Sequence, residues 1–166
     1  MTLATASPAG LPSARIVLLR GYDERGFTFF TNCRSRKGRE LESNANAALV
    51  FYWAGLERQL RIEGPVVCLE PSESDAYFAK RPRGHQLSAW ASKQSEPLAD
   101  RARIEAEMRR YDAIFAGREV ERPPYWGGYR VLPERFEFWQ GRPDRMHDRI
   151  AYVRREKGWQ RERLSP

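Results

Sequence analysis

Hydrophobic and polar positions in the first half of the chain alternate in short runs that turn-forming residues separate. Residues 13–20 (SARIVLLR) are rich in β-branched and apolar side chains, and they follow residues 7–10 (SPAG), which are typical of a hairpin turn. A second turn at residues 23–26 precedes an aromatic run, and residues 47–53 (AALVFYW) have the apolar character of a buried strand. The pattern predicts antiparallel strands rather than alternating strands and helices.

The same pattern continues through the middle and the end of the chain. Residues 57–63 (ERQLRIE) alternate with period two, as a half-buried strand does, and Gly64-Pro65 predicts a bulge or bend before residues 66–69. Further strands are expected at residues 128–132, 135–140, 147–154 and 159–164.

Three helices punctuate these strands. The first is expected at residues 35–43 with Ser35 as its N-cap, and the second opens at residues 71–75 with Ser72 and Asp75 spaced as a capping box. The third covers about residues 98–116, where one apolar stripe indicates core or a subunit interface and consists of Ile104, Met108, Tyr111 and Phe115.

Taken together, these elements predict one domain over residues 1–166. The expected fold class is mainly β with peripheral helices (α+β), in which short antiparallel strands close into a barrel. No internal repeat, linker or low-complexity segment divides the chain.

Charge and composition narrow the class of partner. The net charge of +7, from 29 Lys and Arg against 22 Asp and Glu, favours an anionic partner such as nucleic acid, a membrane surface or a phosphorylated small molecule. The basic residues stand in short separate groups, which suits discrete phosphate pockets, although a solvated basic surface is the alternative. No apolar run reaches the roughly 20 residues of a membrane span, and no signal peptide is present. Two cysteines are too few for a disulfide framework, so we expect a cytoplasmic protein.

Several common catalytic motifs are absent. The chain has no Gly-x-Gly-x-x-Gly, Walker, Gly-x-Ser-x-Gly or His-Glu-x-x-His motif. Only His85 and His147 supply imidazole, and they are far apart in sequence, so neither a metal site nor a Ser-His-Asp triad is expected. If the chain is an enzyme, a cofactor carries the chemistry.

Residues 35–38 (SRKG) are the first candidate phosphate site. They lie at an expected helix start, where free backbone N–H groups and the helix dipole favour an anion, and Arg36 and Lys37 add two cations. The alternative is an ordinary solvated helix.

A second candidate site surrounds Tyr77 and Arg81, with Arg83 and His85 nearby. Tyr77 and Arg81 are four residues apart, so they share one helix face and could hold a phosphate. A snorkelling arginine beside a packed tyrosine explains the pair equally well.

Residues 139–149 form the third candidate. Arg145, His147 and Arg149 have period two, so an extended chain would place all three on one side, where they favour an anion or an acidic partner. Alternatively, Asp144 and Asp148 are structural salt-bridge partners in this segment.

In this order, these segments resemble the pyridoxine (pyridoxamine) 5′-phosphate oxidase family over nearly the whole chain. The motifs that carry the resemblance are RIVLL (15–19), SRKGREL (35–41), ERQ (57–59), YF (77–78), RPR (81–83), SKQS (92–95), WGGY (126–129), FWQG (138–141) and RMHDR (145–149). Each is weak alone, but together and collinear they are specific.

The resemblance implies an antiparallel, Greek-key type split β-barrel that forms a homodimer and binds FMN at the subunit interface. The FMN contacts that it implies are Arg15, Ile16, Val17, Leu18, Leu19, Arg20, Phe30, Thr31, Arg36, Lys37, Gln59, Gln94, Ser95, Trp139 and Arg149. The substrate phosphate is expected at Arg20, Tyr77, Arg81 and His85, whereas Arg145 and His147 are the expected catalytic and substrate-binding residues around the pyridine ring.

The implied reaction converts pyridoxine 5′-phosphate or pyridoxamine 5′-phosphate to pyridoxal 5′-phosphate. It belongs to vitamin B6 biosynthesis and salvage, with O2 as electron acceptor and H2O2 as product. Partners are thus a small phosphorylated pyridine, O2 and a second copy of the chain, and neither nucleic acid nor a membrane is expected.

Four features depart from the family pattern. Arg20 stands at a usual Lys, His85 at a common small hydroxyl residue, and Phe30 at a frequent Tyr. Moreover, the N-terminal segment that covers the active site of relatives is expected to be missing here, because Met1 falls almost on the first strand and the start reads like trimmed mid-family sequence.

Three alternatives remain open. A sister split-barrel FMN oxidase could act on another small substrate, and Arg20 and His85 favour it. A basic β-barrel could bind single-stranded nucleic acid through some of its five Trp, seven Tyr and eight Phe residues. A flavin or pyridoxal phosphate carrier without turnover is the third.

Overall fold

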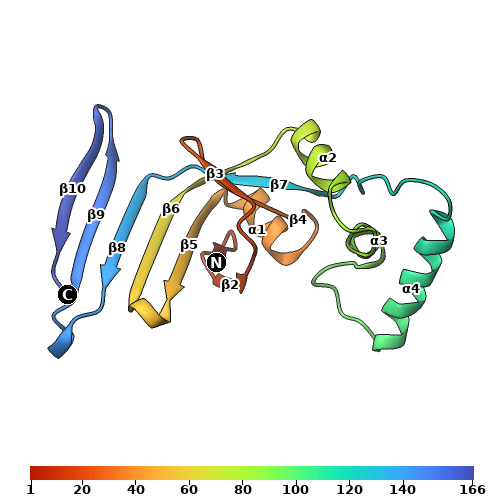
Figure 1. Ribbon diagram of the computed structural model, residues 1–166, viewed down its shortest axis with the longest axis horizontal. Coiled ribbons are helices and arrows are strands. Elements are labelled where there is room, and N and C mark those ends of the chain that lie inside the picture. Colours follow the sequence, from red (N-terminus) through yellow and green to blue (C-terminus); the bar gives the residue numbers. More distant parts are fainter. The chain divides into compact units, whose positions relative to one another are not determined.

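The computed structural model describes all residues from Met1 to Pro166 and contains ten β-strands, four α-helices and two short 3₁₀ turns. Figure 1 labels most of these elements. The strands are β1 (Thr2–Ala6), β2 (Pro12–Ile16), β3 (Gly21–Asp23), β4 (Gly26–Asn32), β5 (Asn46–Trp53), β6 (Arg58–Cys68), β7 (Trp126–Val131), β8 (Arg135–Gln140), β9 (Asp148–Arg155) and β10 (Gly158–Leu164). The helices are α1 (Arg36–Ser43), α2 (Pro71–Ala79), α3 (Arg83–Ala91) and α4 (Arg101–Ile114), and the 3₁₀ turns are η1 (Ala54–Leu56) and η2 (Pro143–Arg145).

The strands form one sheet in the order β10-β9-β8-β6-β5-β1-β2. The successive pairs along this path are antiparallel; β3 is attached to β4, and β7 pairs with both β4 and β6. The predicted class, mainly β with peripheral helices, is therefore confirmed. However, the path has two ends, so the sheet does not close on itself as predicted.

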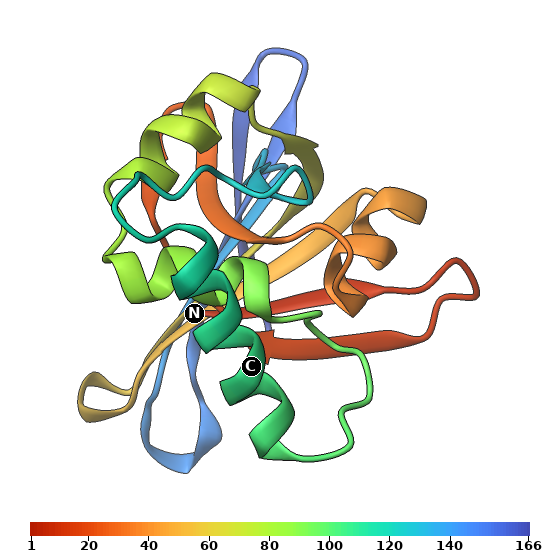
Figure 2. The same cartoon turned by 90° about the vertical axis from the view of Figure 1, so that its right-hand side faces the viewer.

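The chain folds as two compact units, each with its own core. Unit 1 comprises residues 1–29, 40–67 and 129–166, and unit 2 comprises residues 30–39 and 68–128. The core of unit 1 contains fully buried side chains from several strands, namely Leu3, Phe29, Leu49, Ile62, Val131 and Ala151. Unit 2 carries α2, α3 and α4, which gather together in both views of the chain (Figures 1 and 2), around Phe78, Leu87, Phe115, Val120 and Trp126.

Local signals explain several element boundaries. The β1–β2 hairpin turns at Ser7–Gly10, where the backbone N–H of Gly10 donates to the carbonyl of Ser7 and Gly10 has a φ of +78°. Ser35 caps α1 as predicted, since its Oγ accepts a hydrogen bond from the backbone N–H of Gly38. The helix predicted at residues 98–116 is α4, whose N-cap Asp100 accepts from the backbone N–H of Arg103.

The apolar stripe of α4 belongs to the core of unit 2. Phe115 is buried there, and Met108 and Tyr111 pack against the same cluster.

Three predictions about elements are wrong, and one helix was missed. The strand expected over residues 13–20 ends at Ile16. The Gly64-Pro65 pair does not interrupt β6, because the antiparallel ladder to β5 continues through both residues. The capping box at Ser72 and Asp75 is absent, since α2 begins with Pro71 at its first position and has no side-chain cap. Finally, α3 was not predicted, because its nine residues follow Pro82, contain Gly84 and lack a strong apolar stripe.

None of the helices combines the length and the apolar character that a membrane-spanning segment requires.

Candidate functional site

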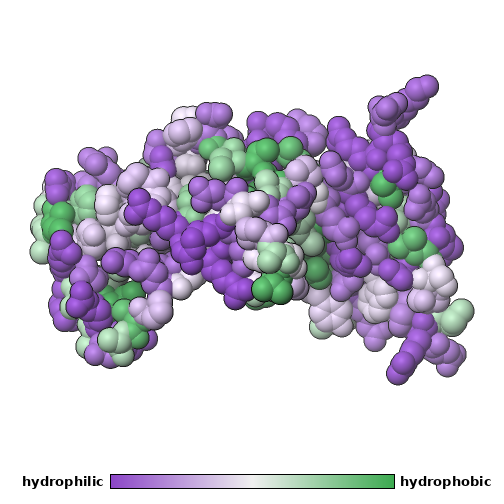
Figure 3. All heavy atoms as spheres, turned by 180° about the vertical axis from the view of Figure 1, so that it is seen from behind, coloured by the Kyte–Doolittle hydropathy of each residue, from purple (hydrophilic) through white to green (hydrophobic).

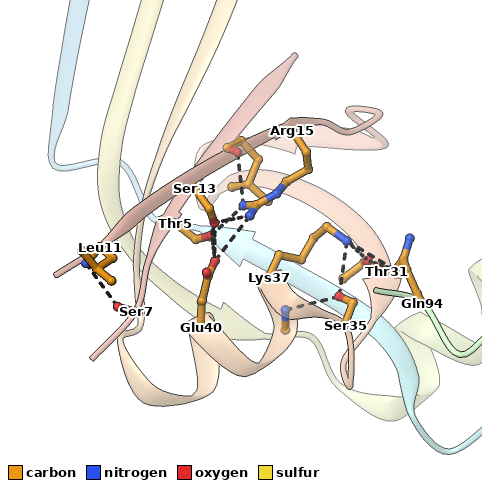
Figure 4. Close-up of polar contacts among 12 residues, drawn as sticks. Thr5, Ser7, Leu11, Ser13, Arg15, Thr31, Ser35, Lys37, Glu40 and Gln94 are labelled. Atoms are coloured by element: carbon orange, nitrogen blue, oxygen red, sulfur yellow. Dashed lines mark hydrogen bonds and ion pairs between the residues drawn. The ribbon is translucent and has the colours of Figure 1, made fainter. Parts of the chain in front are cut away.

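The first turn of α1 and the adjoining segments of unit 2 hold a buried lysine. The Lys37 side chain reaches three neutral oxygens, with its Nζ 3.2 Å from Thr31 Oγ1, 3.3 Å from Ser35 Oγ and 3.3 Å from Gln94 Oε1 (Figure 4). Thr31 also donates to Gln94 Oε1 at 3.2 Å. Ser35 is fully buried and Lys37 is only 7% exposed, so three side chains converge on one buried ammonium group.

The electrostatics of this cluster favour an anion. Arg36 and Lys37 stand in the first turn of α1, which contains no acidic residue. Cations there face the positive end of the helix dipole, which is unfavourable unless a negative group is bound nearby. A phosphate group at this helix start would meet both cations and the positive end of the helix dipole, so these residues fit a phosphorylated ligand.

Gln94 and Ser95 lie in the turn after α3. Gln94 contacts the Lys37 cluster, whereas Ser95 adopts a left-handed conformation with a φ of +72° beside it in the chain. The structure therefore brings Thr31, Lys37 and Gln94 together. Arg36 and Ser95 directly adjoin Lys37 and Gln94 in the chain.

In unit 1, three of the expected cofactor residues form a row across neighbouring strands. Gln59 of β6 is paired with Trp139 of β8, and Trp139 is paired with Arg149 of β9. Residues directly opposite each other on adjacent strands point to the same face of a sheet. Gln59 and Trp139 also line a groove of about 350 Å³. The tertiary structure thus gathers residues that are up to 90 positions apart, from 59 to 149.

Glu137 is a partner of this row that the sequence analysis missed. Its carboxylate lies 2.9 Å from Arg149 Nε and 3.3 Å from Arg61 Nη1, and its side chain is 5% exposed. Burial pushes the pKa of Glu137 upward, but the hydrogen bond from Arg149 and the charges of nearby arginines leave this pKa below its ordinary value. The same hydrogen bond raises the pKa of Arg149. The only sequence signal for Glu137 was the alternation of charged and apolar residues at positions 136–139 (FEFW). That alternation could not show that Glu137 pairs with Arg149.

The loop between β8 and β9 carries Arg145 and His147. The predicted extended chain with period two is wrong here, because Arg145 ends the 3₁₀ turn η2 with a φ of +60° and β9 begins only at Asp148. The ring of His147 lies 4.7 Å from that of Trp139, and its Nδ1 accepts a hydrogen bond from the backbone N–H of Arg142. The imidazole is thus oriented by the loop itself.

Asp148 has the structural role that was one alternative for this segment. It forms ion pairs with Arg142 at 2.9 Å and with Arg163 at 2.7 Å. Hydrogen bonds from these two arginines lower the pKa of Asp148.

The segment from Arg15 to Arg20 lies at the end of β2 and just beyond it. Arg15 and Ile16 are the last residues of β2, whereas Val17, Leu18, Leu19 and Arg20 precede β3 outside any strand. Arg15 is bound within unit 1 to Glu40, Thr5 and Ser13 (Figure 4). Ile16 and Leu18 expose most of their side chains.

The expected substrate-phosphate residues of unit 2 belong to an aromatic stack. Tyr77 of α2 lies with its ring 4.0 Å from that of Phe30, and Arg81 follows α2 with its guanidinium 4.6 Å from the centre of the Trp126 ring. His85 is exposed on α3. Tyr77 is therefore packed, which agrees with the alternative of a packed tyrosine beside an arginine. Trp126, which belongs to the WGGY motif but was not a predicted site residue, contacts both Tyr77 and Arg81.

The fold and these groups of residues define a small β protein with a basic, anion-binding helix start and clusters of aromatic side chains. Comparison with known proteins shows the family to which it belongs. A family model described as pyridoxamine 5′-phosphate oxidase matches residues 1–115, and one described as the pyridoxine 5′-phosphate oxidase C-terminal dimerisation region matches residues 126–166. The chain belongs to the pyridoxine/pyridoxamine 5′-phosphate oxidase family, a family of oxidoreductases.

Individual relatives agree with this assignment. The chain is 59% identical to a pyridoxine/pyridoxamine 5′-phosphate oxidase of Rubrobacter xylanophilus, and the match covers all of this chain and 76% of that relative. It is 58% identical to a pyridoxine/pyridoxamine 5′-phosphate oxidase of Thermosynechococcus vestitus, and that match covers all of this chain and 78% of the relative. Among solved structures, PhzG from Burkholderia lata 383 in complex with tetrahydrophenazine-1-carboxylic acid matches with a TM-score of 0.92 and 37% identity, covering 99% of this chain and 81% of that one. A pyridoxamine 5′-phosphate oxidase-related, FMN binding protein from Nostoc punctiforme matches with a TM-score of 0.77, 99% and 87% coverage and 19% identity, which shows the shared fold alone.

Proposed function

We propose that this chain is an FMN-dependent oxidase that converts pyridoxine 5′-phosphate or pyridoxamine 5′-phosphate to pyridoxal 5′-phosphate. The observation that carries the proposal is the buried Lys37 at the start of α1, held by Thr31, Ser35 and Gln94, in a chain of this family. When bound, FMN would accept a hydride from the C4′ carbon of the substrate and pass the electrons to O2, which gives H2O2.

The residues of the chain would bind and orient the two ligands. Arg36 and Lys37, with the backbone N–H groups of α1, would hold the cofactor phosphate. Gln59, Trp139 and Arg149 form one cross-strand row in unit 1 and would contact the remainder of the cofactor. The other FMN contacts would come from Arg15 to Arg20, Phe30, Thr31, Gln94 and Ser95.

The substrate would be held through its phosphate and its ring. Tyr77, Arg81, His85 and Arg20 would bind the phosphate, and Arg145 and His147 would bracket the pyridine ring. His147 already has a fixed orientation, because its Nδ1 accepts from the backbone N–H of Arg142 and its ring lies against Trp139. Orientation of the reacting carbon can supply several kcal/mol of the rate enhancement, which suits a site without a conventional acid–base pair.

We further propose that the protein acts as a homodimer. The C-terminal 41 residues, 126–166, match the family's dimerisation region, and they include an open apolar groove of about 550 Å³ lined by Phe136, Phe138, Ile150, Tyr152, Trp159 and Arg161. Apolar residues show among the hydrophilic ones over these strands in Figure 3. Exposed apolar patches of this kind favour association with another protein surface.

The test compares FMN with riboflavin, which lacks the phosphate. Lys37→Met should weaken FMN binding at least about tenfold and leave riboflavin binding nearly unchanged, because only the phosphate contact is lost. Quenching of flavin fluorescence on titration measures both dissociation constants.

Arg39→Ala is the matched control, since Arg39 is a basic residue of the same helix but is exposed. Wild-type protein that binds neither flavin would contradict the cofactor assignment. Protein that binds FMN should also be bleached by pyridoxine 5′-phosphate without oxygen and regain its colour in air, with formation of pyridoxal 5′-phosphate.

A second candidate function is oxidation of another small substrate by the same cofactor. The similarity to PhzG, at 37% identity over 99% of this chain, favours it, as do Arg20 and His85 at the expected phosphate site. A yellow protein that binds FMN with Lys37-dependent affinity but does not react with either vitamin B6 phosphate would favour this candidate.

A further inference from the structure

Trp126 lies at the centre of an aromatic stack in unit 2. Its ring is nearly parallel to those of Phe30, at 5.4 Å and 11°, and Tyr77, at 6.1 Å and 3°. Phe78 meets it edge-on at 5.1 Å. Only 6% of Trp126 is exposed, so the indole is an internal part of the fold.

The same indole carries a cation on its face. The guanidinium carbon of Arg81 lies 4.6 Å from the centre of the Trp126 ring and 5.5 Å from the centre of the Phe78 ring. A guanidinium on an aromatic face is attracted by the ring quadrupole, and Trp is the strongest such partner. Trp126 therefore restricts where the Arg81 side chain can point.

The backbone around Trp126 is itself held in place. Its carbonyl accepts a hydrogen bond from Arg122, whose Nε also pairs with Asp75 of α2 at 2.6 Å. Two residues further on, Gly128 leaves room for the stack, because a Cβ there would come within 2.7 Å of the Phe30 ring. Arg122 thus ties the Trp126 strand to the helix that carries Tyr77.

We propose that Trp126 is a positioning residue for the substrate-phosphate site: it holds the Arg81 guanidinium and the Tyr77 ring in the arrangement that binds a phosphate monoester. This inference rests on the proposed function, in which Tyr77 and Arg81 bind the substrate phosphate. Phe30 then has a role of its own here, because its ring stacks with both Tyr77 and Trp126.

The kinetic test uses the FMN-loaded protein with pyridoxine 5′-phosphate. Trp126→Leu should raise KM about tenfold while kcat changes less than about twofold, and Trp126→Phe should recover most of the loss because a ring remains under Arg81. In an Arg81→Ala background, Trp126→Leu should raise KM by no more than about threefold, since one of the two groups that it positions is gone.

Tyr111→Leu is the matched control. Tyr111 packs against the same core cluster and has a cation over its ring, Arg110 at 5.5 Å, but neither residue belongs to the phosphate site. Its removal should leave KM unchanged. An unchanged KM in Trp126→Leu, or an equal loss with and without Arg81, would overturn the inference.

A second readout does not depend on turnover. Protons of the Arg81 side chain should be shifted by the ring current of Trp126 in nuclear magnetic resonance spectra, with the assignment made from Arg81→Ala, and Trp126→Leu should remove most of that shift. Added inorganic phosphate should perturb the same signals more in the wild type than in the variant. If wild-type protein shows no turnover, the proposed function fails, and these spectra still decide whether Trp126 positions Arg81 for a phosphate. Identical Arg81 signals and phosphate responses in both proteins would refute the positioning.

Discussion

Arg15 Nη2 lies 3.3 Å from Glu40 Oε2, and the two side chains are 21% and 7% exposed. Ser13 donates to the same carboxylate oxygen at 2.6 Å, and Thr5 donates to it as well (Figure 4). Arg15 in turn donates to Thr5 and Ser13, so the four side chains form one closed network within unit 1. An arginine that the family resemblance assigns to the cofactor is thus oriented by a carboxylate of the SRKGREL motif to which the resemblance assigns no role in the site.

Glu40→Ala should therefore destabilise the protein. Removal of one partner of a largely buried ion pair leaves the other charge poorly compensated, which typically costs about 3 to 5 kcal/mol, and the partial exposure of Arg15 should reduce this to about 2 to 3 kcal/mol. Urea unfolding measures the change in the free energy of unfolding. Arg101→Ala, which breaks the exposed Arg101–Glu105 pair of α4, is the control and should cost only a few tenths of a kcal/mol. Equal costs for the two variants would show that the network does not stabilise the fold.

Glu137 should make stability depend on pH in the acid range. Because its pKa in the folded protein is lowered from the ordinary value of 4.5, its contribution is complete above that value and is lost as the pH falls through the lower folded pKa. Glu137→Gln should thus be less stable than the wild type at pH 7, and the difference should shrink as the pH falls below about 4. Unfolding curves recorded between about pH 3 and pH 7 test this. A difference that stays constant over the range would contradict the assignment of the lowered pKa to Glu137.

Arg145 should show a conflict between stability and activity. Asp144 and Arg145 both have left-handed backbone conformations, with φ of 56° and 60°, and each such non-glycine residue costs roughly 1 kcal/mol. Asp144→Gly and Arg145→Gly should both leave stability unchanged or raise it by up to about 1 kcal/mol, as thermal unfolding would show. Only Arg145→Gly should reduce kcat/KM, by at least about tenfold, because it alone removes the guanidinium proposed to position the substrate. Equal activity of the two glycine variants would exclude Arg145 from the site.

Gly64 is required by a close approach of two backbone segments. A Cβ at this position would lie 2.0 Å from the carbonyl oxygen of Leu132, and a backbone atom cannot move aside as a side chain can. Gly64→Ala should therefore lower the free energy of unfolding by about 2 kcal/mol or more. Gly55→Ala, where nothing lies within 4 Å of the added Cβ, should change it by less than about 0.5 kcal/mol. A stability of Gly64→Ala close to the wild-type value would mean that the two segments can separate without cost.

Much of the fold and part of the candidate site could be predicted from local sequence. Period-two alternation and turn residues identified β5, β6 and the four C-terminal strands, because these signals act between residues close in the chain. Ser35 and the basic pair after it indicated a helix start suited to an anion, and the structure places Lys37 there in a buried cluster. The collinear motifs predicted the family, which the comparisons confirm.

Only the tertiary structure decided which distant residues act together. The pairs Arg15–Glu40 and Glu137–Arg149, the row from Gln59 to Arg149, and the stack of Trp126 on Tyr77 each join segments that are separate in sequence. Even the conformation of Arg145 departs from the local pattern, because the short turn η2 replaces the extended chain that alternation predicts. Alternation and capping report the state of a single segment, whereas a buried charge or a stacked ring depends on what other segments bring to it. That is why the sequence by itself determined most of the elements and the family, and the packing of those elements determined the partners of each candidate residue.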